Sequence, residues 1–384
     1  MPDKHARLNP SASHRWINCP GSVALAEQMP VSTSDYAEEG TTAHALAELK
    51  LRKYLGELRG AAFTSKLNKI KASEYYCEEM EEATDFYVDA VLERLAAAGQ
   101  DAELMVEQQF SLEAWVPDSF GTSDAVVIGG NVIEVIDLKY GKGVKVDAPE
   151  NPQLRLYGLG AAGLFGDLYD FDTVRETIVQ PRLDHVSTEE VELTALMSWA
   201  SEVVAPAAKM AMENTEYTCA GDWCRFCPAK AVCRARAESN LELAKYDFKK
   251  GPLLEDAEIG EILQKAEELE KWAADVAAYA LEQALAGKKY DGWKLVEGRS
   301  IRKYADDLKV ADALKAAGYD EAMLYERKLY GITAMEKIVG KKKLTETLGE
   351  LIVKPQGKPT LVPESDKREE LKTAEAVKAD FANN

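Results

Sequence analysis

The fold is decided by the stretch Ser123-Asp-Ala-Val-Val-Ile-Gly-Gly-Asn-Val-Ile-Glu-Val-Ile-Asp-Leu-Lys139. Two mainly apolar runs flank Gly129–Asn131, which is a strong hairpin-turn signal. Side chains alternate between the two faces of a strand, so Asp137 and Lys139 share one face at the polar end of the second run. The hairpin predicts that Asp124, at the start of the first run, lies beside Asp137.

The segments on either side of the hairpin predict a mixed α/β unit. In chain order, the predicted elements are a helix from about Thr41, a helix over 74–98, strands over 104–110, 123–128 and 132–139, a helix over 151–165 and a strand over Thr173–Gln180. Further helices are expected around 188–213 and over 256–286. The order across residues 41–181 is therefore helix, three strands, helix, strand.

The hairpin also predicts a site for a divalent metal. Paired carboxylates such as Asp124 and Asp137 can hold Mg²⁺ or Mn²⁺ through oxygen ligands, and Lys139 can stabilise charge on a phosphate or orient a water. Glu134 has the opposite phase in the strand and is a poor candidate for the same site. The alternative is that Asp124 is a turn residue and Asp137 and Lys139 form a surface ion pair.

Composition limits the classes of protein to consider. The chain has 384 residues, 46% of them hydrophobic, and a formal net charge of −19. This charge argues against extensive coating of nucleic acid but allows local basic patches. No apolar run reaches transmembrane length, so a cytoplasmic protein without a membrane partner is expected. In that compartment the six cysteines are expected to be thiols or metal ligands.

Four motifs resemble those of the PD-(D/E)XK nucleases, and specifically of their RecB-like branch. Gly121-Thr-Ser-Asp124 and Ile136-Asp-Leu-Lys139 resemble the two acidic motifs. Gly40-Thr-Thr-Ala-His44 resembles the Gly-x-x-x-His motif, and Gln153-Leu-Arg-Leu-Tyr157 resembles the Gln-x-x-x-Tyr motif. One departure is that no proline precedes Asp124. The resemblance implies a restriction-endonuclease-like core with an iron–sulfur clasp and a mainly helical C-terminal extension.

The resemblance also implies roles for these residues in an Mg²⁺- or Mn²⁺-dependent deoxyribonuclease, specifically an exonuclease. Those roles are metal binding by His44, Asp124 and Asp137, assistance to the attacking water by Lys139, and positioning of the DNA strand by Gln153 and Tyr157. Two alternatives from other classes are a non-catalytic nucleic-acid-binding or scaffold protein that keeps the nuclease fold, and a zinc-stapled interaction module.

The cysteines predict a metal centre at the end of this core. Cys224, Cys227 and Cys233 are spaced closely enough to bind one centre, and the fourth ligand is Cys219 in a local zinc knuckle or the distant Cys19. By themselves they favour zinc. One RecB-like branch carries a [4Fe–4S] cluster with one ligand before the core and three after it. That resemblance implies Cys19, Cys224, Cys227 and Cys233 as the ligands, with zinc as the alternative metal.

A second resemblance covers residues 5 to about 237. It is to an uncharacterised phage and prophage family placed among these nucleases. The markers are Ser11-Ala-Ser-His-Arg-Trp-Ile-Asn-Cys-Pro-Gly-Ser22, Ala37-Glu-Glu-Gly-Thr41, Ile136-Asp-Leu-Lys-Tyr-Gly-Lys-Gly143 and Gln180-Pro-Arg-Leu-Asp-His185. It implies a role in phage recombination or DNA processing in a bacterial host, on DNA with single-stranded or end character, with a phage recombination or annealing protein as a possible partner.

The expected organisation has four parts. They are residues 1–40 with the first cluster cysteine, 41–237 with the core and the other cluster cysteines, 238–350 with helices and a basic hairpin, and a flexible tail over 351–384. Candidate phosphate contacts near the core site are Lys139, Lys142, Lys145, Arg155 and Arg182. The basic, aromatic segment Lys288–Tyr304 is either a further contact for single strands or a solvated hairpin.

Overall fold

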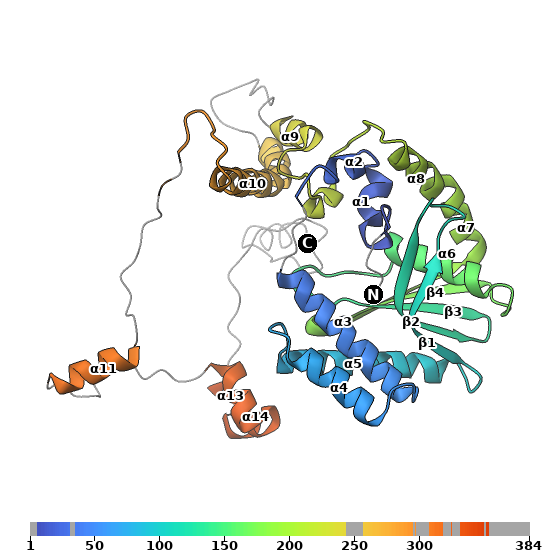
Figure 1. The fold of residues 1–384 in the computed structure, drawn as a ribbon, viewed down its shortest axis with the longest axis horizontal. Helices are drawn as coiled ribbons and strands as arrows, with labels where there is room; N and C mark the ends of the chain where they lie inside the picture. The colour runs from blue at the N-terminus through green and yellow to red at the C-terminus, as the bar shows by residue number, and fades with distance from the viewer. Residues whose placement is uncertain are drawn as a thin grey trace, which may run out of the picture. The chain divides into compact units, whose positions relative to one another are not determined.

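A five-stranded sheet forms the core of the first compact unit, Met1–Glu282, in a computed structural model (Figure 1). The structure describes residues 6–30, 35–242, 256–294, 296, 307–317, 324, 331–348 and 351–352. The strands, in spatial and chain order, are β1 (Glu103–Ser111), β2 (Phe120–Gly129), β3 (Val132–Leu138), β4 (Thr173–Gln180) and β5 (His185–Glu192). Neighbouring strands are antiparallel except β3 and β4, which are parallel.

The β2–β3 hairpin has the register that its turn predicts. Gly129 pairs with Val132, and Gly130 at the turn has a φ of 61°, a conformation that glycine adopts without steric cost. The pairing continues to Ala125 and Ile136. One position further on, Asp124 and Asp137 lie at the end of the hairpin away from the turn.

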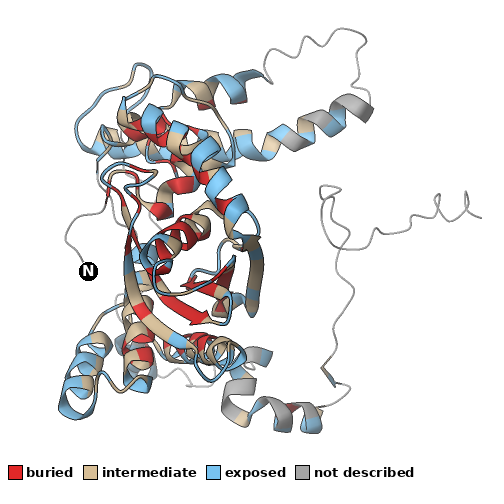
Figure 2. Cartoon of the chain, turned by 90° about the vertical axis from the view of Figure 1, so that its right-hand side faces the viewer, coloured by how far each residue is buried: buried red, intermediate tan, exposed pale blue. Residues whose placement is uncertain are grey.

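Helices cover both faces of the sheet and form two apolar layers. Helix α6 (Pro152–Phe165) packs on β1 to β4, and α7 (Leu193–Trp199), the π-helical segment η3 (Ala200–Val204) and α8 (Ala205–Met212) extend this layer. On the other face lie α3 (Asp35–Tyr54) and α5 (Glu78–Ala97), with α4 (Gly60–Lys71) packed on α3. Figure 2 shows buried residues concentrated in the sheet and the helices against it.

Helix α6 is the crossover that parallel strands β3 and β4 require. The Asn151 side chain caps its first turn by accepting hydrogen bonds from the backbone N–H groups of Gln153 and Leu154 at 3.0 and 3.4 Å. Pro152 occupies the first turn, where no N–H donor is needed. Gly160 allows the helix to approach Phe110 on β1 so closely that a Cβ atom would collide with it. The start of α6 is therefore held firmly at the end of β3.

The N-terminal segment lies beside the cysteine-bearing segment. It comprises η1 (Pro10–Ala12), α1 (Ser13–Asn18) and α2 (Ser22–Ala26), and it packs on α6, α8 and η4 (Asp222–Phe226). After the cysteines come α9 (Arg234–Leu241) and the long α10 (Asp256–Leu285). The Arg236 side chain, 2% exposed, pairs with Glu268 and Asp275 of α10 at 2.6 Å each. The first compact unit therefore runs to Glu282, past the boundary expected after residue 237.

The second compact unit spans Gln283–Asn384. Its described helices are α11 (Asp307–Ala316), α13 (Ile332–Val339) and α14 (Lys341–Leu348), of which α13 and α14 pack together. The described part of the predicted basic hairpin, residues 288–294, contains turns and no strand. Nearly all of the predicted tail lies outside the described residues. None of the described helices is both long and apolar enough to cross a lipid bilayer.

The mixed α/β architecture and its element order are confirmed, with three differences. Helix α3 begins at Asp35 rather than near Thr41, and α4 was not predicted. Residues 188–192, expected to begin a helix, belong to strand β5. This strand alternates small, apolar and charged residues at the edge of the sheet, and charged side chains are typical of edge strands because they discourage pairing with other chains.

Candidate functional site

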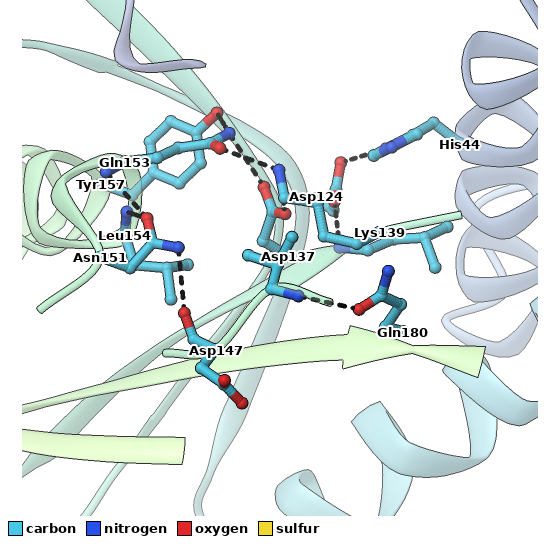
Figure 3. Close-up of polar contacts among 12 residues, drawn as sticks. His44, Asp124, Asp137, Lys139, Asp147, Asn151, Gln153, Leu154, Tyr157 and Gln180 are labelled. Carbon is cyan, nitrogen blue, oxygen red and sulfur yellow. Dashed lines mark hydrogen bonds and ion pairs between the residues drawn. The ribbon is translucent and has the colours of Figure 1, made fainter. Parts of the chain in front are cut away.

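The candidate site lies where the pairing of β2 with β3 ends, between α3 and α6 (Figure 3). Asp124 Oδ1 lies 2.7 Å from Nδ1 of His44 on α3. The other carboxylate oxygen of Asp124 accepts a hydrogen bond of 2.7 Å from the backbone N–H of Leu138. These two contacts fix Asp124 against the helix on one side and the neighbouring strand on the other.

Asp137 is the centre of a second polar chain. Its Oδ2 lies 2.8 Å from Lys139 Nζ, and its Oδ1 accepts a 3.2 Å hydrogen bond from Gln153 Nε2. Lys139 Nζ donates to Gln153 Oε1 at 2.8 Å, and Gln153 Nε2 also donates to the Tyr157 hydroxyl at 2.9 Å. Asp137, Lys139, Gln153 and Tyr157 therefore form one continuous network.

The glycine of the first acidic motif has a local steric role. A Cβ atom at Gly121 would lie 2.8 Å from both Pro10 and the Tyr157 ring. Real Cβ atoms do not approach other atoms so closely, so only glycine lets the tyrosine lie flat against β2. Gly121 thus positions Tyr157, and through it Gln153, at the end of the strands.

The carboxylates differ in their electrostatics. Burial opposes ionisation of both, but the charge and hydrogen bond of His44 hold the pKa of Asp124 below its usual value. Burial and the charge of Asp124 raise the pKa of Asp137 in spite of Lys139. Burial lowers the pKa of His44, but the charge and hydrogen bond of Asp124, together with the charge of Asp137, outweigh this effect and raise the pKa to about 9. At neutral pH His44 is therefore a cation beside the ionised Asp124.

The structure adds Glu107, a carboxylate that the sequence reasoning missed. Glu107 lies on β1, where its φ of 53° interrupts the pairing with β2 between the partners of Ala125 and Ser123, next to Asp124. Burial and the charges of Asp124 and Glu48 raise its pKa to about 7. The alternation of residues along β1 could not identify Glu107 as a site residue. Its place beside Asp124 follows from the register of β1 against β2.

Four of the basic residues expected near phosphates are paired with carboxylates. Arg182 contacts Glu39 and Glu79 at 3.2 and 3.1 Å, and Arg155 contacts Glu189 at 3.6 Å. The other two pairs are Lys142 with Glu79 and Lys145 with Asp147. Of the five expected contacts, Lys139 alone reaches into the carboxylate site.

Cys19 lies next to the segment that carries Cys219, Cys224, Cys227 and Cys233. Cys219 N–H donates to Cys19 Sγ at 3.4 Å across 200 positions of sequence, and Gly21 N–H donates to the Tyr217 carbonyl at 2.9 Å. A Cβ atom at Gly21 would meet this carbonyl oxygen at 2.5 Å, so glycine is needed for the approach. The structure thus brings both candidate fourth ligands, Cys19 and Cys219, to the same place.

The thiols of this group influence one another. Burial raises the pKa of Cys224 to about 11, and charges at Cys227 and Cys233 act in the same direction. Burial also raises the pKa of Cys227, as do charges at Cys233 and Cys19. Several buried thiolates are unfavourable without a cation, and a metal centre supplies that charge. The donor chemistry fits a thiolate-bound metal.

Neither the carboxylate site nor the cysteine group has the geometry of a complete metal site. Within the described ranges, no set of three His, Cys, Asp or Glu side chains has the geometry to hold a metal ion. At the carboxylate site, Asp124 and Asp137 instead contact His44 and Lys139. A divalent ion held by His44, Asp124 and Asp137 would have to replace these contacts, and the nearby Glu107 would add its charge.

Comparison with known proteins places the chain in a family. The family model described as "Protein of unknown function (DUF2800)" matches residues 5–369, so the chain belongs to this family. Among solved structures, the crystal structure of SSO0001 matches with 15% sequence identity over 58% of this chain and 96% of that chain. Its TM-score of 0.24 is too low to support any argument about fold or activity.

Proposed function

We propose that this protein is a metal-dependent deoxyribonuclease with a RecB-like, PD-(D/E)XK core. The supporting observation is the polar network in which Asp124 and Asp137, from adjacent strand ends, are joined to His44 on one side and to Lys139, Gln153 and Tyr157 on the other. We propose the reaction as exonucleolytic hydrolysis of DNA during phage recombination or DNA processing in a bacterial cytoplasm.

Each side chain has its own role in the proposed phosphodiester hydrolysis. His44, Asp124 and Asp137 would hold Mg²⁺ or Mn²⁺, which polarises the phosphate and acidifies a bound water. Lys139 lies 2.8 Å from Asp137 and can donate to the attacking water or to a phosphate oxygen. Water adds to phosphorus, one P–O ester bond breaks, and the leaving oxygen gains a proton.

Gln153 and Tyr157 are positioning residues in this proposal. They occupy one face of α6 and are hydrogen-bonded to each other at 2.9 Å. Gln153 also holds the ammonium of Lys139, so it orients the group that assists the water. A strand bound against α6 would meet both side chains before it reached Asp137.

The thiol group serves as a clasp in the same proposal. Cys19, Cys224, Cys227 and Cys233 would hold a [4Fe–4S] cluster, with zinc as the alternative metal. The buried thiols and the close approach of Cys19 to the Cys219 N–H support a shared centre. Anaerobic purification followed by metal analysis and an absorption spectrum tests it, since an iron–sulfur protein absorbs broadly near ~400 nm.

A cleavage assay with one matched control tests the enzyme. Asp137→Asn should lower Mg²⁺- or Mn²⁺-dependent cleavage of end-labelled DNA by roughly 10³-fold, because it removes a metal-binding charge. Asp147→Asn is the control, since Asp147 is half exposed and pairs with Lys145 and His185 outside the network. Circular DNA substrates separate exonucleolytic from endonucleolytic cleavage. Undiminished cleavage by purified Asp137→Asn would refute the proposal.

A further inference from the structure

A groove of about 360 Å³ separates α3 from α4, which lie side by side in Figure 1. We infer that this groove guides an unpaired DNA strand to the carboxylate site and that Lys66 and Lys69 bind its phosphates. The inference rests on the proposed function and adds a path for its substrate. None of the predicted motifs lies on α4.

Two lysines give this groove a local positive charge. Lys66 and Lys69 are exposed on α4 and line the groove, and neither has an acidic partner among the described residues. By contrast, the neighbouring Lys71 is paired with Glu81 at 2.9 Å. In a chain with a net charge of −19, two unpaired lysines on one groove form a local site for anions.

The groove leads to the site along α3. Thr41, Ala45 and Glu48 line it, and the spacing of these residues puts them on one face of the helix. His44 precedes Glu48 by one helical turn and contacts Asp124 at 2.7 Å. The groove therefore runs along α3 past the turn that carries His44.

The other lining residues favour an unpaired strand over a duplex. Leu49, Leu58 and Ile70 give the groove an apolar wall between its lysines and hydroxyl groups. A single strand exposes sugar and base surfaces that can pack on such a wall while its phosphates meet cations. In a duplex the base faces are stacked and unavailable, so a duplex would use the lysines alone.

A binding experiment with the full-length protein tests this path. The probe is fluorescent oligothymidylate in EDTA, which prevents cleavage, titrated at several salt concentrations. Lys66→Ala/Lys69→Ala should weaken binding on the order of 10-fold at ~0.1 M salt and reduce the slope of log K against log salt by about 1.4, because each phosphate contact on a single strand contributes about 0.7. Lys66→Arg/Lys69→Arg should restore most of the binding.

The matched control is Lys209→Ala/Lys271→Ala, which removes the same charge from α8 and α10, where these side chains are 76% and 51% exposed. It should bind as the wild type does. If the wild type and the Lys66→Ala/Lys69→Ala variant bind with equal affinity and equal salt slope, and both cleave normally, the proposed role of the groove is wrong. The proposed nuclease activity would still hold. Wild-type protein that neither binds nor cleaves DNA would overturn both. If the control loses as much affinity as the Lys66/Lys69 variant, the effect is one of general charge, and the proposed role of the groove is wrong.

Discussion

His44 Nδ1 and Asp124 Oδ1 lie 2.7 Å apart and connect residues 80 positions distant in sequence. The contact joins α3, on one face of the sheet, to the strand end that also carries the backbone contact with Leu138. Because both side chains are largely buried, their opposite charges stabilise each other more than a surface pair would. The pair thus holds the strand and the helix together at the candidate site.

This pair predicts a pH dependence of stability. The pKa of His44 is raised from 6.5 to about 9, so its stabilising contribution is complete below about pH 6.5 and is lost as the pH rises through about 9. His44→Gln should therefore lower the free energy of unfolding in EDTA by a few kcal/mol at about pH 6 and much less at about pH 10. Denaturant unfolding at both pH values measures this. The same loss at both would contradict the assignment of the raised pKa to His44.

Glu107→Gln should have opposite effects on stability and on metal affinity. The raised pKa of about 7 means that ionising Glu107 lowers stability progressively from about pH 4.5 to about pH 7. The variant should therefore be the more stable protein at about pH 8 without metal, yet bind Mn²⁺ more weakly because a nearby negative charge is gone. Unfolding in EDTA and a Mn²⁺ titration measure the two effects. Exposed Glu113→Gln, just beyond β1, should change neither.

Two glycines of α6 provide a matched test of how closely the helix approaches the sheet. A Cβ atom at Gly160 would collide with Phe110, whereas no atom lies within 4 Å of a Cβ atom at Gly163. Gly160→Ala should lower the free energy of unfolding by about 1–3 kcal/mol through overpacking. Gly163→Ala should raise it by up to about 1 kcal/mol through helix propensity. Equal stability of the two variants in urea would show that α6 can move away from β1 without cost.

Single cysteine substitutions test which residue is the fourth ligand of the proposed metal centre at Cys224, Cys227 and Cys233. Cys19→Ser should lose most of the bound metal and lower the thermal midpoint by on the order of 5 °C. Cys77→Ser is the control, because Cys77 lies 3.8 Å from the Tyr140 hydroxyl, away from the other thiols. Metal analysis and melting of anaerobic samples measure both effects. Loss of metal from Cys219→Ser but not from Cys19→Ser would instead favour the local knuckle.

The buried guanidinium of Arg236 should hold α10 to the cysteine segment. Arg236→Met removes two ion pairs and leaves Asp275 paired with Lys230 alone, at a cost of about 2 kcal/mol because Glu268 and Asp275 both retain some contact with water. Hydrogen exchange should speed up in α10 while β2 and β3 stay protected. Lys271→Met, which removes an exposed pair on α10, is the control. Unchanged exchange in the Arg236 variant would show that other contacts hold the helix.

Local sequence patterns predicted the parts of this fold that are determined by residues close together in the sequence. The period-two alternation and the Gly-Gly-Asn turn were enough to place Asp137 and Lys139 on one face and to separate them from Glu134, which contacts Thr177 at 2.7 Å on the other. The edge strand β5 was missed because its polar sequence lacks an apolar face. Glu107 was missed because its place depends on a backbone angle and on the register of another strand.

The approach of Cys19 to Cys219 has a consequence for the order in which the chain folds. The sheet and its two helical layers are complete in sequence by residue 212, whereas Tyr217, whose carbonyl accepts the hydrogen bond from Gly21 beside Cys19, comes later. During synthesis the segment around Cys19 must therefore wait, without its backbone partner, until nearly two hundred further residues have been added. Closing so long a loop becomes favourable only once the sheet holds its ends near each other. We expect the clasp to be the last part of the core to form, and its formation to mark a chain whose sheet has already folded.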